Sequence, residues 1–288
     1  MEKSVLTPLK PLVTIRPSSG WAALNLREIW QFRDLLITLA GRDVKLRYRQ
    51  TAVGVLWVVL QPLLAAGIFS FVFGKVAHLP SPGNFPYFVF SYAGMLGWQA
   101  FSSTLSKASA CLVGNSQLVS KVFFPRLVLP LSTVFSTLID FGVALVMMFV
   151  LLAITHVMPT VAILTLPVWM MLILVLAMGI GMMAAAMMVS YRDVQYVLPV
   201  LVSFLQYGSP VGYAVVYVMV QLPAQYHALY MMNPLASLLE GLRWSLLGSS
   251  APVPSWSWAL YAAFVAVGIF VWGAFGFKKM ERKFADVI

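Results

Sequence analysis

Six long apolar segments constrain the fold of this 288-residue chain more than any other feature. A helix needs about 20 apolar residues to cross roughly 30 Å of hydrocarbon. The segments that reach this length lie at about 52–74, 85–112, 127–153, 161–189, 196–220 and 256–277. Hydrophobic residues make up 61% of the chain and charged residues 10%, which excludes an ordinary soluble domain. The sequence therefore predicts an all-α polytopic membrane protein with six transmembrane helices.

Basic residues are unevenly distributed among the predicted connections. If the amino terminus is cytoplasmic, 17 of the 19 Lys and Arg lie on the cytoplasmic side, and only Lys75 and Arg243 lie outside. Positive charge marks the cytoplasmic side of membrane proteins, so both termini are predicted to be cytoplasmic. The net charge of +10 then reflects orientation and attraction to membrane lipids, and no nucleic-acid partner is expected.

The regions before the first span and after the last are predicted to lie outside the bilayer. Apolar residues recur at helical spacing from Ile29 to Leu39, which predicts an amphipathic helix in the cytoplasmic interface. The predicted organisation is a flexible basic extension at 1–26, the interface helix and a charged segment at 27–51, a six-span domain at 52–277 and a basic cytoplasmic tail at 278–288.

The stretch 222–248 is also apolar, but it contains Asn233-Pro234, Glu240 and Arg243. A seventh crossing here would place the basic tail outside. We predict instead an outer re-entrant hairpin of two short half-helices that break at Asn233-Pro234. Irregular backbone at membrane depth persists only where protein or a water-filled cavity satisfies it, so the hairpin is expected to pack against the spans.

Asp140 is an acid near the middle of the third predicted span, where a charge is costly. The favoured interpretation is a packing acid that bonds to Gln99, Ser102 and Ser103 of the second span. A role in the translocation path or in proton coupling is the alternative. Lys107 is expected to extend toward the cytoplasmic interface.

Candidate substrate-channel residues combine aromatic faces with hydrogen-bonding groups, which suit sugar rings. Trp57 and Gln61 are four residues apart in the first span, and Gln206, Tyr213 and Tyr217 fall near one face of the fifth. The alternative is an ordinary interfacial aromatic belt and helix packing.

Motifs of enzymes are absent from the sequence. Neither a phosphate loop of the form G-x-x-x-x-G-K-[ST] nor a paired acid and base constellation occurs. The chain is therefore not expected to be an enzyme, to bind ATP itself or to hold a cofactor or metal.

One charged and apolar sequence around the start of the first span is specific. It runs Arg42-Asp43-Val44-Lys45-Leu46-Arg47-Tyr48-Arg49-Gln50-Thr51 and continues with Val53-Gly54-Val55-Leu56-Trp57 and Leu60-Gln61-Pro62-Leu63. Shorter matching pieces are Ser120-Lys121-Val122-Phe123-Phe124-Pro125-Arg126, Tyr191-Arg192-Asp193-Val194 and Asn233-Pro234-Leu235. In this order they resemble the permease subunits of ABC type-2 exporters of polysaccharides such as O-antigen, capsular polysaccharide and teichoic acid.

The resemblance implies a homodimer bound to two copies of a separate ATPase subunit, which binds ATP and Mg. It implies that residues 115–126 form a coupling helix that docks on this ATPase. The implied coupling residues are Asn115, Ser120, Lys121, Phe123, Phe124, Pro125 and Arg126. It also implies that Trp57, Gln61, Gln206, Tyr213 and Tyr217 line a channel at the dimer interface.

The leading hypothesis is therefore a permease that exports a lipid-linked polysaccharide across the bacterial inner membrane. One alternative is an ABC type-2 exporter of a drug or a small lipid-linked oligosaccharide. Another is a proton-coupled secondary transporter that uses Asp140.

Overall fold

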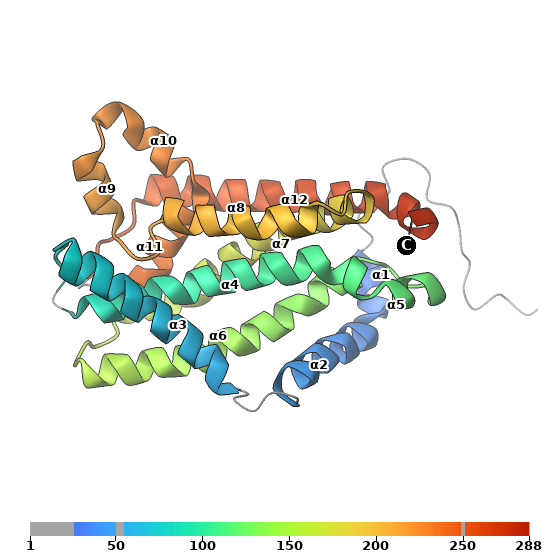
Figure 1. Cartoon of the computed structure of the whole chain (residues 1–288), viewed down its shortest axis with the longest axis horizontal. Helices are drawn as coiled ribbons and strands as arrows, with labels where there is room; N and C mark the ends of the chain where they lie inside the picture. The colour runs from blue at the N-terminus through green and yellow to red at the C-terminus, as the bar shows by residue number, and fades with distance from the viewer. Residues whose placement is uncertain (1–25, 50–54, 84, 249–250, 288) are drawn as a thin grey trace, which may run out of the picture.

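The computed structural model describes residues 26–49, 55–83, 85–248 and 251–287, which form a bundle of long helices lying side by side (Figure 1). The long elements are α3 (Val55–Phe69) with the π-helix η1 (Ser70–Val76), α4 (Tyr87–Gly114), α6 (Val128–Ile154), η2 (Val161–Thr165) with α7 (Leu166–Ser190), α8 (Val194–Gly208) and α12 (Trp256–Val287). The shorter elements are α1 (Leu26–Gln31), α2 (Arg33–Arg49), α5 (Ser116–Lys121), α9 (Val215–Gln221), η3 (Ala224–Tyr226), α10 (His227–Met231) and α11 (Pro234–Leu247). We call the end of the bundle that carries α9, α10 and α11 the hairpin end, and the opposite one the α5 end.

Four helices in the described ranges are long and apolar enough to cross a bilayer. They span Leu56–Val76, Val128–Ile154, Val161–Ser190 and Trp256–Glu281. These helices correspond to the first, third, fourth and sixth predicted spans. The chain is therefore a multi-pass membrane protein.

The prediction of one continuous helix over 196–220 is wrong. Helix α8 has 15 residues and ends at Gly208, and α9 begins only at Val215. At the rise of an α-helix, α8 is about 22 Å long, which is shorter than the hydrocarbon core. We call the non-helical segment 209–214 the interruption.

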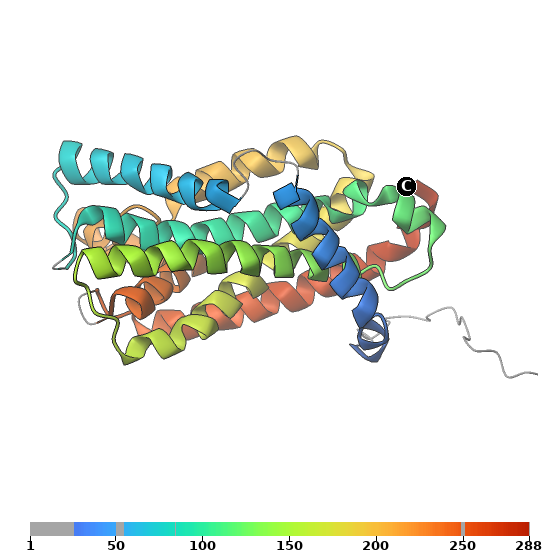
Figure 2. The same ribbon diagram turned by 90° about the horizontal axis from the view of Figure 1, so that it is seen from below.

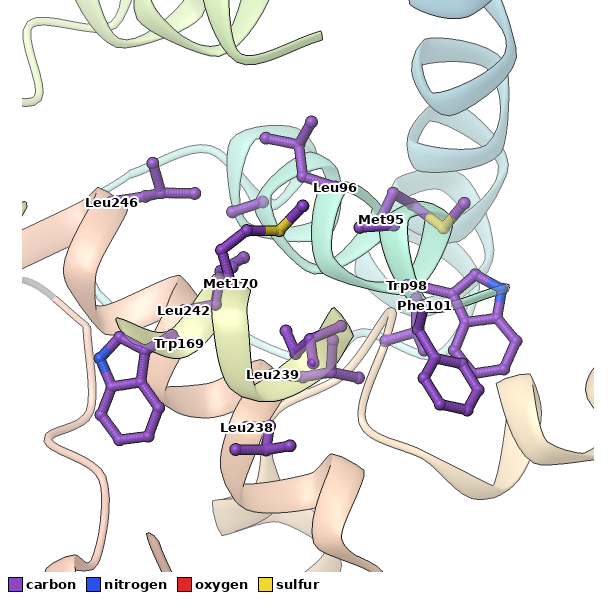
Figure 3. Packing of buried hydrophobic residues seen from close by; sticks show 14 of the residues in the cluster. Met95, Leu96, Trp98, Phe101, Trp169, Met170, Leu238, Leu239, Leu242 and Leu246 are labelled. Carbon is purple, nitrogen blue, oxygen red and sulfur yellow. The ribbon is translucent and has the colours of Figure 1, made fainter. Parts of the chain in front are cut away.

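Helix α4 lies at the centre of the bundle and packs against α3, α6, α7 and α11. It has 28 residues, and its polar side chains keep it out of the set of strongly apolar helices. Figure 3 shows its apolar residues Met95, Leu96, Trp98 and Phe101 among side chains of α7 and α11. Protein thus covers much of this helix.

Helices α7 and α12 approach each other closely at two glycines. A Cβ atom added to Gly273 would lie 2.1 Å from the carbonyl oxygen of Gly179, and one added to Gly179 would lie 2.6 Å from the backbone of Phe270. Small residues allow such close backbone contact between membrane helices. The two helices therefore form a tightly packed pair.

Helices α1 and α2 lie at the α5 end, and Figure 2 shows α2 running obliquely to the long helices. The apolar residues Ile29, Phe32, Leu36 and Leu39 pack into a cluster with α4, α7 and α12. The apolar stripe thus contacts protein, and its location in the membrane interface stays a prediction. The predicted tail 278–288 is helical as far as Val287, because α12 continues through it. The predicted extension 1–26 lies almost entirely outside the described residues.

Candidate functional site: a polar groove beside helix α4

A groove of about 420 Å³ opens between α3, α4 and α8. Its lining residues are Gln61 and Ala65 of α3, Met95, Trp98, Gln99, Ser102, Ser103 and Ser106 of α4, and Val202, Ser203 and Gln206 of α8. Most of these side chains carry an amide or a hydroxyl group, and none is charged. Because both groups donate and accept hydrogen bonds, the groove can bind a neutral ligand rich in hydroxyl groups.

The groove depends on the spacing of polar residues along α4. Ser102, Ser103 and Ser106 follow Gln99 by three, four and seven residues, which places all four on one helical face. From the sequence, Gln99, Ser102 and Ser103 are expected only as neighbours of Asp140, and Ser106 and Ser203 are not predicted as site residues. The helical spacing of Ser106 was a signal that could have found it.

Asp140 adjoins a small cavity of about 20 Å³, which is enough for about one water molecule. Gln99 and Ser103, two of the expected neighbours, line this cavity too. The Asp140 carboxylate also forms an ion pair, since its Oδ2 atom lies 3.1 Å from Nζ of Lys107. Lys107 Nζ further donates to Oγ of Ser136 at 2.9 Å. Lys107 therefore turns toward α6, which differs from the expectation that it extends to the interface.

The predicted channel residues do not share one surface. Gln61 and Gln206 line the groove, whereas Trp57 is half exposed on α3 and is not among the lining residues. Tyr213 and Tyr217 lie beyond the end of α8, in the interruption and in α9. The prediction that Gln206, Tyr213 and Tyr217 share a helical face is wrong because the helix ends between the first and the second.

Aromatic residues gather at the hairpin end of the groove. The ring of Phe73 lies 5.8 Å from that of Tyr213, and the ring of Phe69 lies 6.5 Å from that of Tyr207. The Tyr213 hydroxyl donates to the Tyr207 carbonyl at 2.9 Å. We call these four residues the aromatic cluster. Phe69 lies about one helical turn beyond the groove residue Ala65, and Tyr207 directly follows the groove residue Gln206. Tyr217 is separate and donates to the carbonyl of Pro80.

The helical break at Asn233-Pro234 is present, since α10 ends at Met231 and α11 begins at Pro234. The Asn233 side chain caps α11 by accepting from the backbone N–H of Leu235 at 3.1 Å. Helix α11 is buried against α4, α7 and α12, and it contains both Glu240 and Arg243. A re-entrant path through the outer leaflet stays a prediction.

The predicted coupling helix is shorter than 115–126, because α5 ends at Lys121 and no helix occurs again until Val128. Ser120 and Lys121 lie on α5, and Pro125 lies in the following loop. Phe123 is 68% exposed, whereas Phe124 is only 5% exposed. Phe123 therefore lies on the exterior of the bundle, whereas Phe124 is buried inside it.

Two residues of the predicted coupling segment are tied to other helices. The Asn115 side chain accepts from Arg42 of α2 at 2.7 Å, and the Arg126 guanidinium donates to the carbonyl of Glu281 in α12 at 2.7 Å. Neither Arg42 nor Glu281 is predicted from the sequence as a partner of these residues. A movement of the α5 loop would therefore be transmitted to α2 and α12 as well as to α4 and α6.

Comparisons with known proteins identify one family model and several sequence relatives. A family model described as ABC-2 type transporter matches residues 34–247. The O-antigen export system permease protein RfbA of Myxococcus xanthus is 30% identical over 264 residues, which cover 91% of this chain and 98% of the relative. A protein of the same name from Klebsiella pneumoniae is 26% identical over 88% of this chain and 95% of the relative. The polysialic acid transport protein KpsM of Escherichia coli is 25% identical over 69% of this chain and 76% of the relative.

Proposed function

The chain belongs to the ABC-2 type transporter family. We propose that it is the permease subunit of an ATP-driven exporter, which moves a lipid-linked polysaccharide across the bacterial inner membrane. The uncharged groove beside α4 is the observation that carries this proposal, because its amide and hydroxyl groups match the hydroxyl groups of a glycan. The names of the relatives, which include O-antigen permeases and a polysialic acid transport protein, support it.

The proposed topology has six spans and two cytoplasmic termini. Helix α4 supplies the second span, since its 28 residues exceed the length needed to cross the hydrocarbon core. Helix α8, the interruption and the hairpin of α9, α10 and α11 together form the fifth crossing and bring the chain back to the outer side. The charge distribution of the sequence supports a cytoplasmic α5 end and an outer hairpin end.

A homodimer would complete the transport path. The groove is open along the face between α3 and α8, and a second copy placed there would enclose two grooves in one channel. Closed symmetric dimers are the commonest oligomers. Within this arrangement Gln61 and Gln206 face the glycan, and Trp57 lies nearer the α5 end of α3.

Two copies of a separate ATPase subunit would supply the energy, with ATP and Mg bound there. The exposed residues Lys121, Val122 and Phe123 at the α5 end offer a basic and apolar contact to this partner. The permease itself carries out transport rather than a covalent reaction.

Replacing both Gln61 and Gln206 by leucine is expected to reduce glycan export about thirtyfold, because each of the two lost hydrogen bonds weakens the interaction by about 1 kcal/mol. Surface glycan measured in cells that lack the native permease checks this result. The control is Leu64→Met, since Leu64 lies on the same helix, is exposed and is not a groove residue.

Normal glycan export by the double variant would contradict the assigned groove. Export that persists after ATP depletion and collapses with the proton gradient would instead support a proton-coupled transporter that uses Asp140. Normal glycan together with impaired drug efflux would support the drug-exporter alternative.

A further inference from the structure

Arg243 is a buried cation whose side chain binds the interruption between α8 and α9. Its exposed fraction is 2%, and its Nη2 atom donates to the carbonyls of Pro210 at 2.6 Å and Val211 at 2.9 Å. Nη1 lies 3.5 Å from the carbonyl of Tyr213, and the guanidinium lies 4.0 Å above the ring of Phe90. One side chain of α11 therefore binds three carbonyls that no helix satisfies.

Neighbouring elements complete the binding of the interruption. The hydroxyl of Tyr87 in α4 donates to the carbonyl of Gly212 at 2.8 Å, and the Asn233 amide donates to Oγ of Ser209 at 2.9 Å. Gly94 of α4 leaves the required space, because a Cβ atom there would lie 2.1 Å from the Val211 carbonyl oxygen and 2.3 Å from Arg243 Nη2. Non-helical backbone in a membrane is stable only when protein satisfies it in this way.

Tyr213 connects the carbonyls bound by Arg243 to the hairpin end of the groove. Tyr213, whose carbonyl faces Arg243, donates its hydroxyl to the Tyr207 carbonyl and contacts Phe73 with its ring. Tyr207 follows Gln206, and the Gln206 amide lies 3.8 Å from the sulfur of Met95 inside the groove. The conformation of the interruption thus determines where Tyr213 lies, and with it the contacts that join Phe73 and Tyr207 at the hairpin end of the groove.

We propose that Arg243 is a positioning residue for export: by holding the carbonyls of Pro210, Val211 and Tyr213, it keeps the aromatic cluster across the hairpin end of the groove. This inference rests on the proposed topology and homodimer, in which the hairpin end is external and the second copy covers the open side of the groove. The closed cluster separates the groove from the external solution between transport cycles. Glycan passage displaces the aromatic rings while Arg243 retains the backbone.

An arginine is required because its planar guanidinium presents several donors in a fixed geometry and stays charged. Arg243→Met removes all of these donors and leaves three buried carbonyls unsatisfied. Arg243→Lys keeps the charge and part of the bonding. A purely structural role predicts loss of folded protein, whereas a positioning role also predicts a groove that is more accessible from outside.

Thiol labelling of the whole transporter in intact cells tests this role. The single native cysteine, Cys111, is buried, so Ser203→Cys introduces a reporter inside the groove. With a membrane-impermeant maleimide added outside, we expect Ser203→Cys to be labelled at least about tenfold faster in Arg243→Met than in the native background, because leaving even one of the three carbonyls unsatisfied disfavours the closed state by about this factor. Arg243→Lys should give an intermediate rate.

Two controls make the result decisive. Met158 is 79% exposed near the hairpin end, so Met158→Cys should be labelled at the same rate in the native, Arg243 and Gly94 backgrounds. Gly94→Ala displaces the same interruption from α4 without changing charge and should also accelerate labelling of Ser203→Cys, whereas Gly142→Ala, which meets no atom within 4 Å, should not. Gly94→Ala and Arg243→Lys provide the readout if Arg243→Met does not accumulate.

Native labelling rates at Ser203→Cys in the Arg243 and Gly94 variants, with normal labelling of Met158→Cys, would overturn the role of Arg243. Failure of Met158→Cys to react from outside would instead contradict the proposed topology. The two failures are therefore distinguishable.

Discussion

The Phe123→Ala variant is expected to fold normally but to lose most ATPase-driven export. Phe123 is 68% exposed in the loop after α5, on the side of the bundle proposed to meet the ATPase. An aromatic anchor that becomes buried in a partner contributes about 2 kcal/mol or more, so its loss should weaken the complex about thirtyfold. Co-purification of the ATPase and ATP hydrolysis by the complex measure this effect.

Phe124→Ala provides the matched control, because the adjacent ring is only 5% exposed and packs with Val119 and Leu127. Its removal should lower the free energy of unfolding by about 3–5 kcal/mol through a cavity in the bundle. The amount of folded permease, rather than coupling per molecule, should therefore fall. Unchanged coupling in Phe123→Ala would contradict docking at this loop.

Replacing either partner of the Lys107–Asp140 pair alone is expected to destabilise the permease strongly. The two side chains are 26% and 10% exposed, and their charged atoms lie 3.1 Å apart. Removing one partner of a buried pair costs about 3–5 kcal/mol because the other charge loses its compensation. Thermal unfolding of purified Asp140→Asn and Lys107→Met variants measures this loss.

The double variant Lys107→Met with Asp140→Asn distinguishes packing from proton coupling. If the pair serves packing, the double variant should recover much of the lost stability and should export glycan. If Asp140 carries protons, export should fail in the double variant even when the protein is stable. If the stability lost in the double variant equals the sum of the losses in the two single variants, this result would contradict the ion pair.

The sequence predicted four of the long helices well because crossing a bilayer depends on length and apolar composition, which are local properties. The break at Asn233-Pro234 was also predictable, since proline lacks the backbone donor that a continuing helix needs. The end of α8 was missed because the run 196–220 is predominantly apolar and contains no charged residue. Its local signal was Gly208-Ser209-Pro210-Val211-Gly212, a cluster of helix-breaking residues.

Long-range contacts limited the prediction of the site. Gln61 and Gln206 were predicted as channel residues from their chemistry, and the structure places both along one groove. By contrast, Arg243 bonds to backbone atoms more than 30 residues away, and Arg42 reaches Asn115 across 73 positions. No local pattern encodes such pairs, because their donors and acceptors become neighbours only after the helices pack.

The central position of α4 has a consequence for the synthesis of the protein. Its polar face and Lys107 make spontaneous partitioning into lipid unfavourable. Of the helices that pack against α4, α3 precedes it, whereas α6, α7 and α11 follow it in the chain, so α4 leaves the ribosome before these three exist. Stable integration of α4 therefore depends on translation of the later segments, and a nascent chain halted before α7 should leave this helix exposed to quality-control proteases.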